Sequence, residues 1–385
     1  MLIHYNVDRF YKIVGENDPS RGEKMTEKLD WELQEGFAIE KVARGFSLPV
    51  NLAFVPNAKA KKSAPFFYVT ELYGGIKVVT RNKEVFTFAD NLLNYAPDYT
   101  MPGTGESGVT GIVVQKSGDV YASVLYREDN RFKNKVVKFS SQDGLKAEKS
   151  EIIIDGIPSI NAAHQVQALT IHKGKLYVNV GDGMIDPNVA QDDSDLRGKI
   201  LRMNLDGSLP SDNPDPQSYV YAKGLRNPFG AAWRKSDNHL YISDNGPAVD
   251  DRIAKILPGE NYGWPQSMRT NSLFFWWYTQ APTALSFSGD QFGPQFKDHL
   301  FVALFGHAYN EGRSDKGKKI VEMVIDERDN VTHLKDFVRY AGNGPASVCG
   351  LAFGPDGLYF SDLHGEVGFK KGEKSGGNIW KITKT

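Results

Sequence analysis

The chain has little of three things that would narrow its class at once: cysteine, excess charge and long apolar runs. Cys349 is the single cysteine among 385 residues, so no intrachain disulfide can form and a cystine-stapled scaffold is excluded. Lysine and arginine (46) nearly balance aspartate and glutamate (47), and this net charge of −1 predicts no binding to nucleic acid or to an anionic membrane. No apolar run approaches the roughly 18 residues that span a bilayer, so we expect no membrane span.

Several catalytic motifs are also missing. The sequence contains no HExxH, CxxC, P-loop or GxSxG pattern, which leaves a zinc protease, a redox dithiol, an NTPase and an α/β-hydrolase without support. Residues 1–24 lack the apolar core and cleavage site of a signal peptide. The sequence as it stands therefore predicts a cytoplasmic protein, or a periplasmic or extracellular one if it is a processed form.

What the sequence does contain is one short pattern repeated six times. Strand-like runs centred on an aromatic residue recur at intervals of 53 to 64 residues, and their centres are Tyr68, Tyr121, Tyr177, Tyr241, Phe301 and Tyr359. Turns and strands alternating at such a period are typical of a four-stranded propeller blade. We therefore predict an all-β fold, a six-bladed β-propeller of four-stranded blades over residues 37–385. Residues 1–36 are charged, lack the repeat and are predicted to form an N-terminal extension.

Reactive side chains precede the predicted first strands of three repeats. Glu106 lies upstream of this strand in the second repeat, His164 in the third, and Arg226 and Asn227 in the fourth. Because the first strand of every blade lines the central channel, the loops that enter these strands open at one common mouth. An acid, an imidazole and a guanidinium are thus predicted to meet in one pocket, as expected of an active site.

Three segments of the sequence resemble a known family. GKILRMNLDGSLPSDNP, GLRNPFG and DNGPAVDDRIAKILPGENYGWP occur in this order, as in the glucose/sorbosone dehydrogenase family, and the resemblance runs from about Leu48 to Ile382. Members of this family are six-bladed propellers that use pyrroloquinoline quinone (PQQ) and calcium to oxidise aldoses. The resemblance implies the same fold, cofactor, metal and substrate class for this chain.

The resemblance also assigns roles to the residues at the predicted mouth. His164 corresponds to the family's catalytic base, which takes a proton from the sugar's C1 hydroxyl. Arg226 and Asn227 match the GxRNP segment that contacts the cofactor. Glu106 lies where the family has a Gln or Glu near the substrate.

Further cofactor and metal contacts are implied later in the chain. Gly246 and Pro247 match a pair whose backbone carbonyls hold the cofactor's calcium ion. Arg313 and Lys319 are the nearest candidates for the family's late cationic cofactor ligands. These assignments are implied by position in the family pattern, not by the repeats.

The sequence thus predicts a PQQ- and calcium-dependent dehydrogenase that oxidises an aldose at C1 to the lactone and passes electrons to an external acceptor. Two alternatives from other classes stay open. One is a calcium-dependent lactonase or esterase, which would hold its metal through carboxylates and amides at the channel axis. The other is a non-catalytic propeller that binds glycans or protein. The aromatic run at 274–279 suits sugar stacking in either case.

Overall fold

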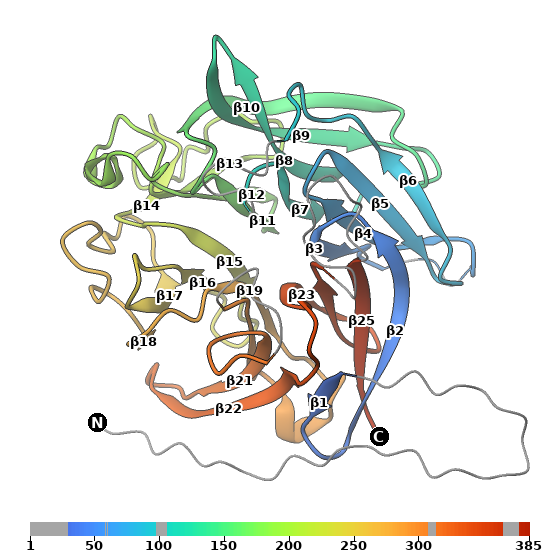
Figure 1. Cartoon of the computed structure of the whole chain (residues 1–385). Helices are drawn as coiled ribbons and strands as arrows, with labels where there is room; N and C mark the ends of the chain where they lie inside the picture. The colour runs from blue at the N-terminus through green and yellow to red at the C-terminus, as the bar shows by residue number, and fades with distance from the viewer. Residues whose placement is uncertain (1–29, 58, 60, 98–105, 307–312, 365–376) are drawn as a thin grey trace, which may run out of the picture.

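The computed structural model describes residues 30–57, 59, 61–97, 106–306, 313–364 and 377–385. In these residues the strands form six antiparallel sheets, arranged as blades around a central channel (Figure 1). The predicted all-β, six-bladed propeller is therefore confirmed. The helices of the described residues are the short 3₁₀ turns η1 (Pro187–Gln191) and η2 (Pro294–Phe296), and neither is long and apolar enough to cross a bilayer.

Each blade has its first strand at the channel and the following strands further out. The strands of the first three blades are β3 (Pro49–Phe54), β4 (Pro65–Glu71), β5 (Gly75–Thr80), β6 (Val85–Ala89), β7 (Val109–Val114), β8 (Val120–Glu128), β9 (Arg131–Ser140), β10 (Lys149–Ile160), β11 (Val166–His172), β12 (Lys175–Val180), β13 (Lys199–Asn204) and β14 (Val220–Lys223). Those of the last three are β15 (Pro228–Trp233), β16 (Leu240–Asp244), β17 (Asp251–Ile256), β18 (Phe274–Trp276), β19 (Pro282–Phe287), β20 (Leu300–Leu304), β21 (Lys319–Ile325), β22 (Val331–Tyr340), β23 (Val348–Gly354), β24 (Gly357–Asp362) and β25 (Gly377–Lys384).

The six repeated aromatic residues lie on the second strand of each blade, at the centre of the packing between blades. At most 5% of any of these residues is exposed. Two of the tyrosines also reach into the following blade: the hydroxyl of Tyr68 donates to the carbonyl of Gly144 at 2.7 Å, and that of Tyr121 to the carbonyl of Leu205 at 3.1 Å. The repeat in the sequence therefore reflects a repeated contact between blades.

The N-terminal strands close the ring. β2 (Phe37–Phe46) pairs with β25 and completes the sixth blade, so segments from the two ends of the chain lie side by side in Figure 1. β1 (Trp31–Leu33) pairs with β22 and adds a fifth strand to the fifth blade. Trp31 packs there against the rings of Tyr340 and Phe360, with centroids 5.2 and 5.1 Å away. The repeat pattern does not indicate these pairings, because both strands lie outside the aromatic-centred runs.

The innermost strands β3, β7, β11, β15, β19 and β23 contact one another in order around the channel. Each pairs antiparallel with the second strand of its own blade. The loop that enters an inner strand therefore lies beside the residues that follow the second strand, at one end of the channel. This end is the mouth, and it brings together residues from distant parts of the chain.

Candidate active site

Three of the predicted residues are joined by hydrogen bonds at the mouth. The Glu106 carboxylate, from the loop before β7, accepts the backbone N–H of His164 at 2.9 Å. It also lies 3.3 Å from Nδ2 of Asn227 and 3.5 Å from Nε2 of Gln167. Glu106 thus bridges the second, third and fourth blades. Its role as a substrate contact stays a prediction.

His164 forms a buried pair with Asp182, an acid that the sequence analysis did not single out. Nδ1 of His164 lies 2.6 Å from Oδ1 of Asp182, and only 5% and 2% of the two residues is exposed. The register of β11 and β12 explains the pairing. Val166 lies opposite Val180, so His164, two residues before Val166, faces Asp182, two residues after Val180. The antiparallel register of β11 and β12 is the feature from which this pairing could have been predicted.

The surroundings of Asp182 keep it ionised. Burial alone would raise the pKa of Asp182, but the hydrogen bond and charge of His164 and the N–H donors of Met184 and Trp264 hold that pKa below its ordinary value. An anionic Asp182 accepts a hydrogen bond from Nδ1–H, so the neutral tautomer of the imidazole carries its hydrogen on Nδ1. Nε2 is then the nitrogen with a free lone pair.

The backbone around His164 is unusual and tightly fitted. His164 has a φ of 47° and Ala162 a φ of 64°, both in the left-handed region that costs energy for residues with a side chain. A Cβ on Gly181 would collide with the carbonyl oxygen of His164, which also accepts the N–H of Gly183 at 3.3 Å. The glycine at 181 therefore allows the close approach that holds the imidazole against Asp182.

The loop that carries Arg226 and Asn227 is organised by Asp244, the last residue of β16. Oδ1 of Asp244 accepts the backbone N–H of Asn227 at 2.7 Å and that of Arg226 at 3.2 Å. Its Oδ2 is bound by Nη2 and Nε of Arg252 at 2.7 and 3.0 Å. Neither member of this ion pair is exposed.

Arg252 extends the network to the loop between β17 and β18. Its remaining donors bind backbone carbonyls, those of Tyr262 (2.6 Å), Met268 (2.9 Å), Thr270 (3.1 Å) and Gly224 (3.2 Å). A buried charge is stable only when it is paired and fully hydrogen-bonded, and Arg252 meets both conditions. One arginine therefore ties the loop carrying Arg226 to the segment that contains Trp264.

The Arg226 side chain faces the loop that follows β16. Nη1 donates to the carbonyls of Asn245 at 2.9 Å and Gly246 at 2.8 Å. The guanidinium carbon lies 5.5 Å from the centre of the Trp264 ring. Two predicted sites, the cofactor-binding arginine and the calcium-binding carbonyl of Gly246, are thus in direct contact.

The loop at Gly246 is shaped by close packing. A Cβ on Gly246 would collide with the carbonyl oxygen of Val249. The N–H of Gly246 donates to Asp251 at 2.8 Å, and burial raises the pKa of Asp251 although several donors from the loop at 279–281 oppose this. Gly246 is buried, whereas Pro247 is exposed.

Two buried oxygens beside these residues have no hydrogen-bond partner within the described part of the chain. They are Oδ1 of Asn227 and Oδ1 of Asn245. Because an unpartnered buried polar atom is costly, such atoms mark a place for a bound group. Within the same described ranges, no group of three or more His, Cys, Asp or Glu side chains could hold a metal ion.

Among the described residues, Arg313 and Lys319 make no contact with the site residues at the mouth. Arg313 is half exposed and lies 4.0 Å from Glu32 of β1, and Lys319 pairs with Asp336 of β22 at 3.0 Å. Both partners belong to the outer half of the fifth blade. The neighbouring Lys318 is buried. The burial of His364, together with the positive charge of Lys318, lowers the pKa of His364 to about 4. Neither Lys318 nor His364 was singled out from the sequence.

Exposed aromatic rings border the mouth on the fourth blade. Trp277 and Tyr278 are 63% and 65% exposed and follow β18 directly. The next residue, Thr279, donates its N–H to the carbonyl of Ala248, so the aromatic pair lies beside the loop at Gly246. The side chain of Arg269 covers the Trp277 ring, 4.4 Å from its centre.

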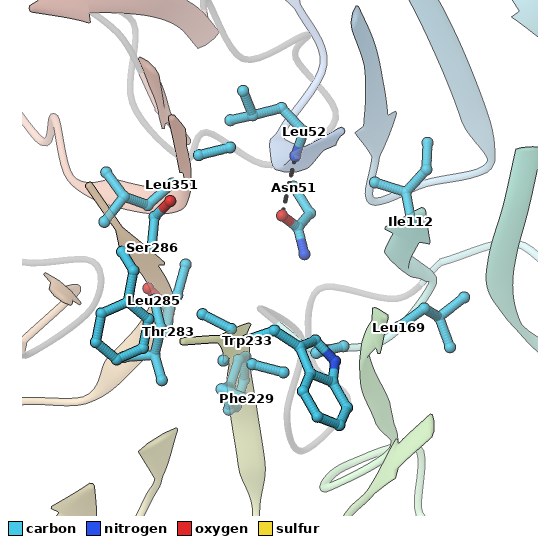
Figure 2. Close-up of a pocket in the computed structure, with 17 residues that line it drawn as sticks. Asn51, Leu52, Ile112, Leu169, Phe229, Trp233, Thr283, Leu285, Ser286 and Leu351 are labelled. Carbon is cyan, nitrogen blue, oxygen red and sulfur yellow. Dashed lines mark hydrogen bonds between the residues drawn. The ribbon is translucent and has the colours of Figure 1, made fainter. Parts of the chain in front are cut away.

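A cavity of about 260 Å³ occupies the channel further along the inner strands. Residues of all six inner strands line it, including Phe229 and Trp233 of β15. The amide of Asn51 points into the space that these strands enclose (Figure 2). His164, Arg226 and Glu106 do not line it. The candidate active site is therefore distinct from this cavity and lies at the mouth, where the inner strands begin.

The buried ion pair yields a stability prediction. Arg252→Gln should lower the free energy of unfolding by about 3–5 kcal/mol, because it leaves the Asp244 carboxylate buried without its cation. Lys83→Gln is the matched control, since it breaks the exposed ion pair with Glu40 and should cost less than about 1 kcal/mol. Urea denaturation measures both, and equal losses in the two variants would contradict the prediction.

Comparison with known proteins assigns the chain to a family. The profile of the Glucose / Sorbosone dehydrogenase family matches residues 46–361. The chain is 38% identical over 140 residues to quinoprotein glucose dehydrogenase B of Acinetobacter calcoaceticus, which covers 31% of this chain and 29% of that protein. It is 27% identical over 213 residues to aldose sugar dehydrogenase YliI of Escherichia coli K12, which covers 49% and 53%. The matches therefore span about half or less of the length of these two relatives.

Solved structures agree on the fold. An oxidoreductase of Thermus thermophilus described as a glucose dehydrogenase has a TM-score of 0.72 and 26% identity, covering 90% of this chain and 100% of that one. The PQQ-bound form of aldose sugar dehydrogenase from Streptomyces coelicolor has a TM-score of 0.68 at 21% identity, covering 91% and 99%. The family profile spans most of the propeller and confirms the resemblance found in the sequence. The chain belongs to the glucose/sorbosone dehydrogenase family.

Proposed function

We propose that this chain oxidises an aldose at C1 to the lactone, with PQQ and calcium as cofactors, and passes the two electrons to an external acceptor. The observation that carries the proposal is the buried His164–Asp182 pair, which lies at the same mouth as Arg226 and the Gly246 loop. Family membership supports it, as do relatives described as a quinoprotein glucose dehydrogenase and as a PQQ-bound aldose sugar dehydrogenase.

The residues around Arg226 fit an anionic quinone with a calcium ion beside it. The guanidinium of Arg226 offers charged donors suited to the carboxylates of PQQ. The amide nitrogen of Asn227 is already bound to Glu106, and its unpartnered Oδ1 is an acceptor. Carbonyl and amide oxygens are ligands that calcium prefers. The carbonyl of Gly246 accepts one hydrogen bond from Arg226 and keeps a second lone pair, and the unpartnered Oδ1 of Asn245 belongs to the neighbouring residue. When bound, PQQ would supply the two-electron acceptor for the hydride from C1.

His164 would act as the general base. Asp182 holds the ring with its proton on Nδ1, which leaves the lone pair of Nε2 to take the proton of the C1 hydroxyl. The sugar then loses that proton and a hydride from C1, and the C1–O bond becomes the carbonyl of the lactone. Trp277 is exposed at the rim, and the face of its ring that Arg269 does not cover offers a flat apolar surface for the sugar ring.

The two alternatives find less support in the same residues. A lactonase would need free carboxylates to hold calcium, but Asp244 is bound by Arg252 and two backbone N–H groups, and Asp251 by donors from two loops. A propeller that only binds glycans would have no use for an imidazole buried against a carboxylate. Of the two alternatives, the glycan-binding propeller leaves the buried His164–Asp182 pair without a role.

Arg226→Ala should weaken PQQ binding by roughly ten- to a hundredfold, because it removes a charged hydrogen-bonding group worth about 1.5–3 kcal/mol. Titration of PQQ in the presence of calcium measures the affinity, and thermal melting of the unliganded proteins measures stability. Arg313→Ala is the comparison, since Arg313 lies by Glu32 in the outer half of the fifth blade and its loss should leave affinity unchanged. A larger loss of affinity in Arg313→Ala than in Arg226→Ala would move the cofactor away from the fourth blade.

His164→Gln should lower kcat about 10²- to 10⁴-fold, the usual contribution of a general base. PQQ affinity should survive, and KM should change little, because the proton is transferred only in the transition state. Steady-state dye reduction with a panel of aldoses, at saturating PQQ and calcium, provides the measurement. Near-normal kcat in a fully loaded variant would remove His164 from the mechanism.

A further inference from the structure

Trp264 lies where the third and fourth blades meet at the mouth. It belongs to the loop between β17 and β18, and its backbone is anchored to the end of β14. Its N–H donates to the carbonyl of Gly224 at 3.0 Å, and Gln191 binds its carbonyl. Arg252 holds the same loop through the carbonyl of Tyr262. The indole is therefore carried by backbone that is fixed on both sides.

The indole N–H completes the contacts of the Asp182 carboxylate. Nε1 of Trp264 donates to Oδ2 at 2.8 Å, while Oδ1 takes His164 at 2.6 Å and the N–H of Met184 at 2.8 Å. With both oxygens occupied, the carboxylate cannot rotate without breaking the bond to Trp264. The orientation of Asp182, and with it that of the imidazole, depends on this donor.

The face of the same indole lies against Arg226. The guanidinium carbon is 5.5 Å from the ring centre, a distance at which a cation is attracted to the ring. The edge of the ring thus contacts the partner of the base, and its face contacts the cation assigned to the cofactor. These two contacts use different parts of one side chain, so substitutions can separate them.

We propose that Trp264 is a positioning residue that sets the His164–Asp182 pair through its N–H and the Arg226 guanidinium through its ring. The inference rests on the proposed function for the roles of His164 and Arg226. It goes beyond that function because it assigns the relative placement of proton acceptor and cofactor cation to one side chain. Burial opposes a charged Asp182, and the indole donor is one of the interactions that keep its pKa low.

Two substitutions test the two contacts. Trp264→Phe keeps an aromatic ring for Arg226 but removes the N–H. Trp264→Gln removes the ring but keeps a donor, because its amide nitrogen is three bonds from Cβ, as Nε1 of tryptophan is. Proton NMR of the unliganded protein reports the His164–Asp182 bond as a downfield Nδ1 proton, assigned by its loss in His164→Gln. Thermal melting reports folding of every variant.

We expect Trp264→Phe to move this resonance upfield or broaden it, and to lower kcat about tenfold with KM unchanged, as loss of an orienting partner does. Its PQQ affinity should stay within about threefold of the wild type, while Trp264→Gln keeps the resonance and loses more affinity. An unchanged resonance together with kcat within twofold in Trp264→Phe would overturn the proposal. If the loaded wild type oxidises no aldose, the proposed function fails, but the NMR comparison still decides whether Trp264 positions the pair.

Discussion

The buried ion pair between Asp244 and Arg252 is the constraint on which the arrangement of the mouth depends. Asp244 fixes the backbone that presents Arg226 and Asn227, and Arg252 gathers four backbone carbonyls, including that of Tyr262. With neither member exposed, both charges must be neutralised within the protein. The pair therefore couples the folding of the fourth blade to the geometry of the candidate active site.

The propeller contributes a register that brings distant residues together. Each inner strand pairs with the second strand of its blade, so a residue just before the first strand faces one just after the second. In the third blade this geometry sets His164 against Asp182. Glu106 of the second blade then accepts the backbone N–H of His164. The residues of the candidate site thus lie on short loops, while the strands provide a rigid frame.

The fold and part of the site could be predicted from the sequence, each for a physical reason. Buried aromatic residues between blades recur because every blade needs the same contact, and this gave the number of blades. The loops before the inner strands bring Glu106, His164 and Asn227 into one hydrogen-bonded network, and the functional roles of these residues stay predictions. Asp182 and Trp264 were missed because their roles depend on strand register and on a loop of the neighbouring blade. Closure by β2 was missed because it lies outside the repeat.

The proposed function requires hydride transfer from a sugar at the mouth, with His164 taking the proton. Its most direct test is a single-turnover experiment without external acceptor, in which the PQQ- and calcium-loaded protein is mixed with an aldose carrying hydrogen or deuterium at C1. The account predicts that absorbance of the oxidised cofactor is lost in proportion to the sugar oxidised, more slowly with deuterium. Loss of absorbance at equal rates with either isotope, or no loss at all, would contradict it.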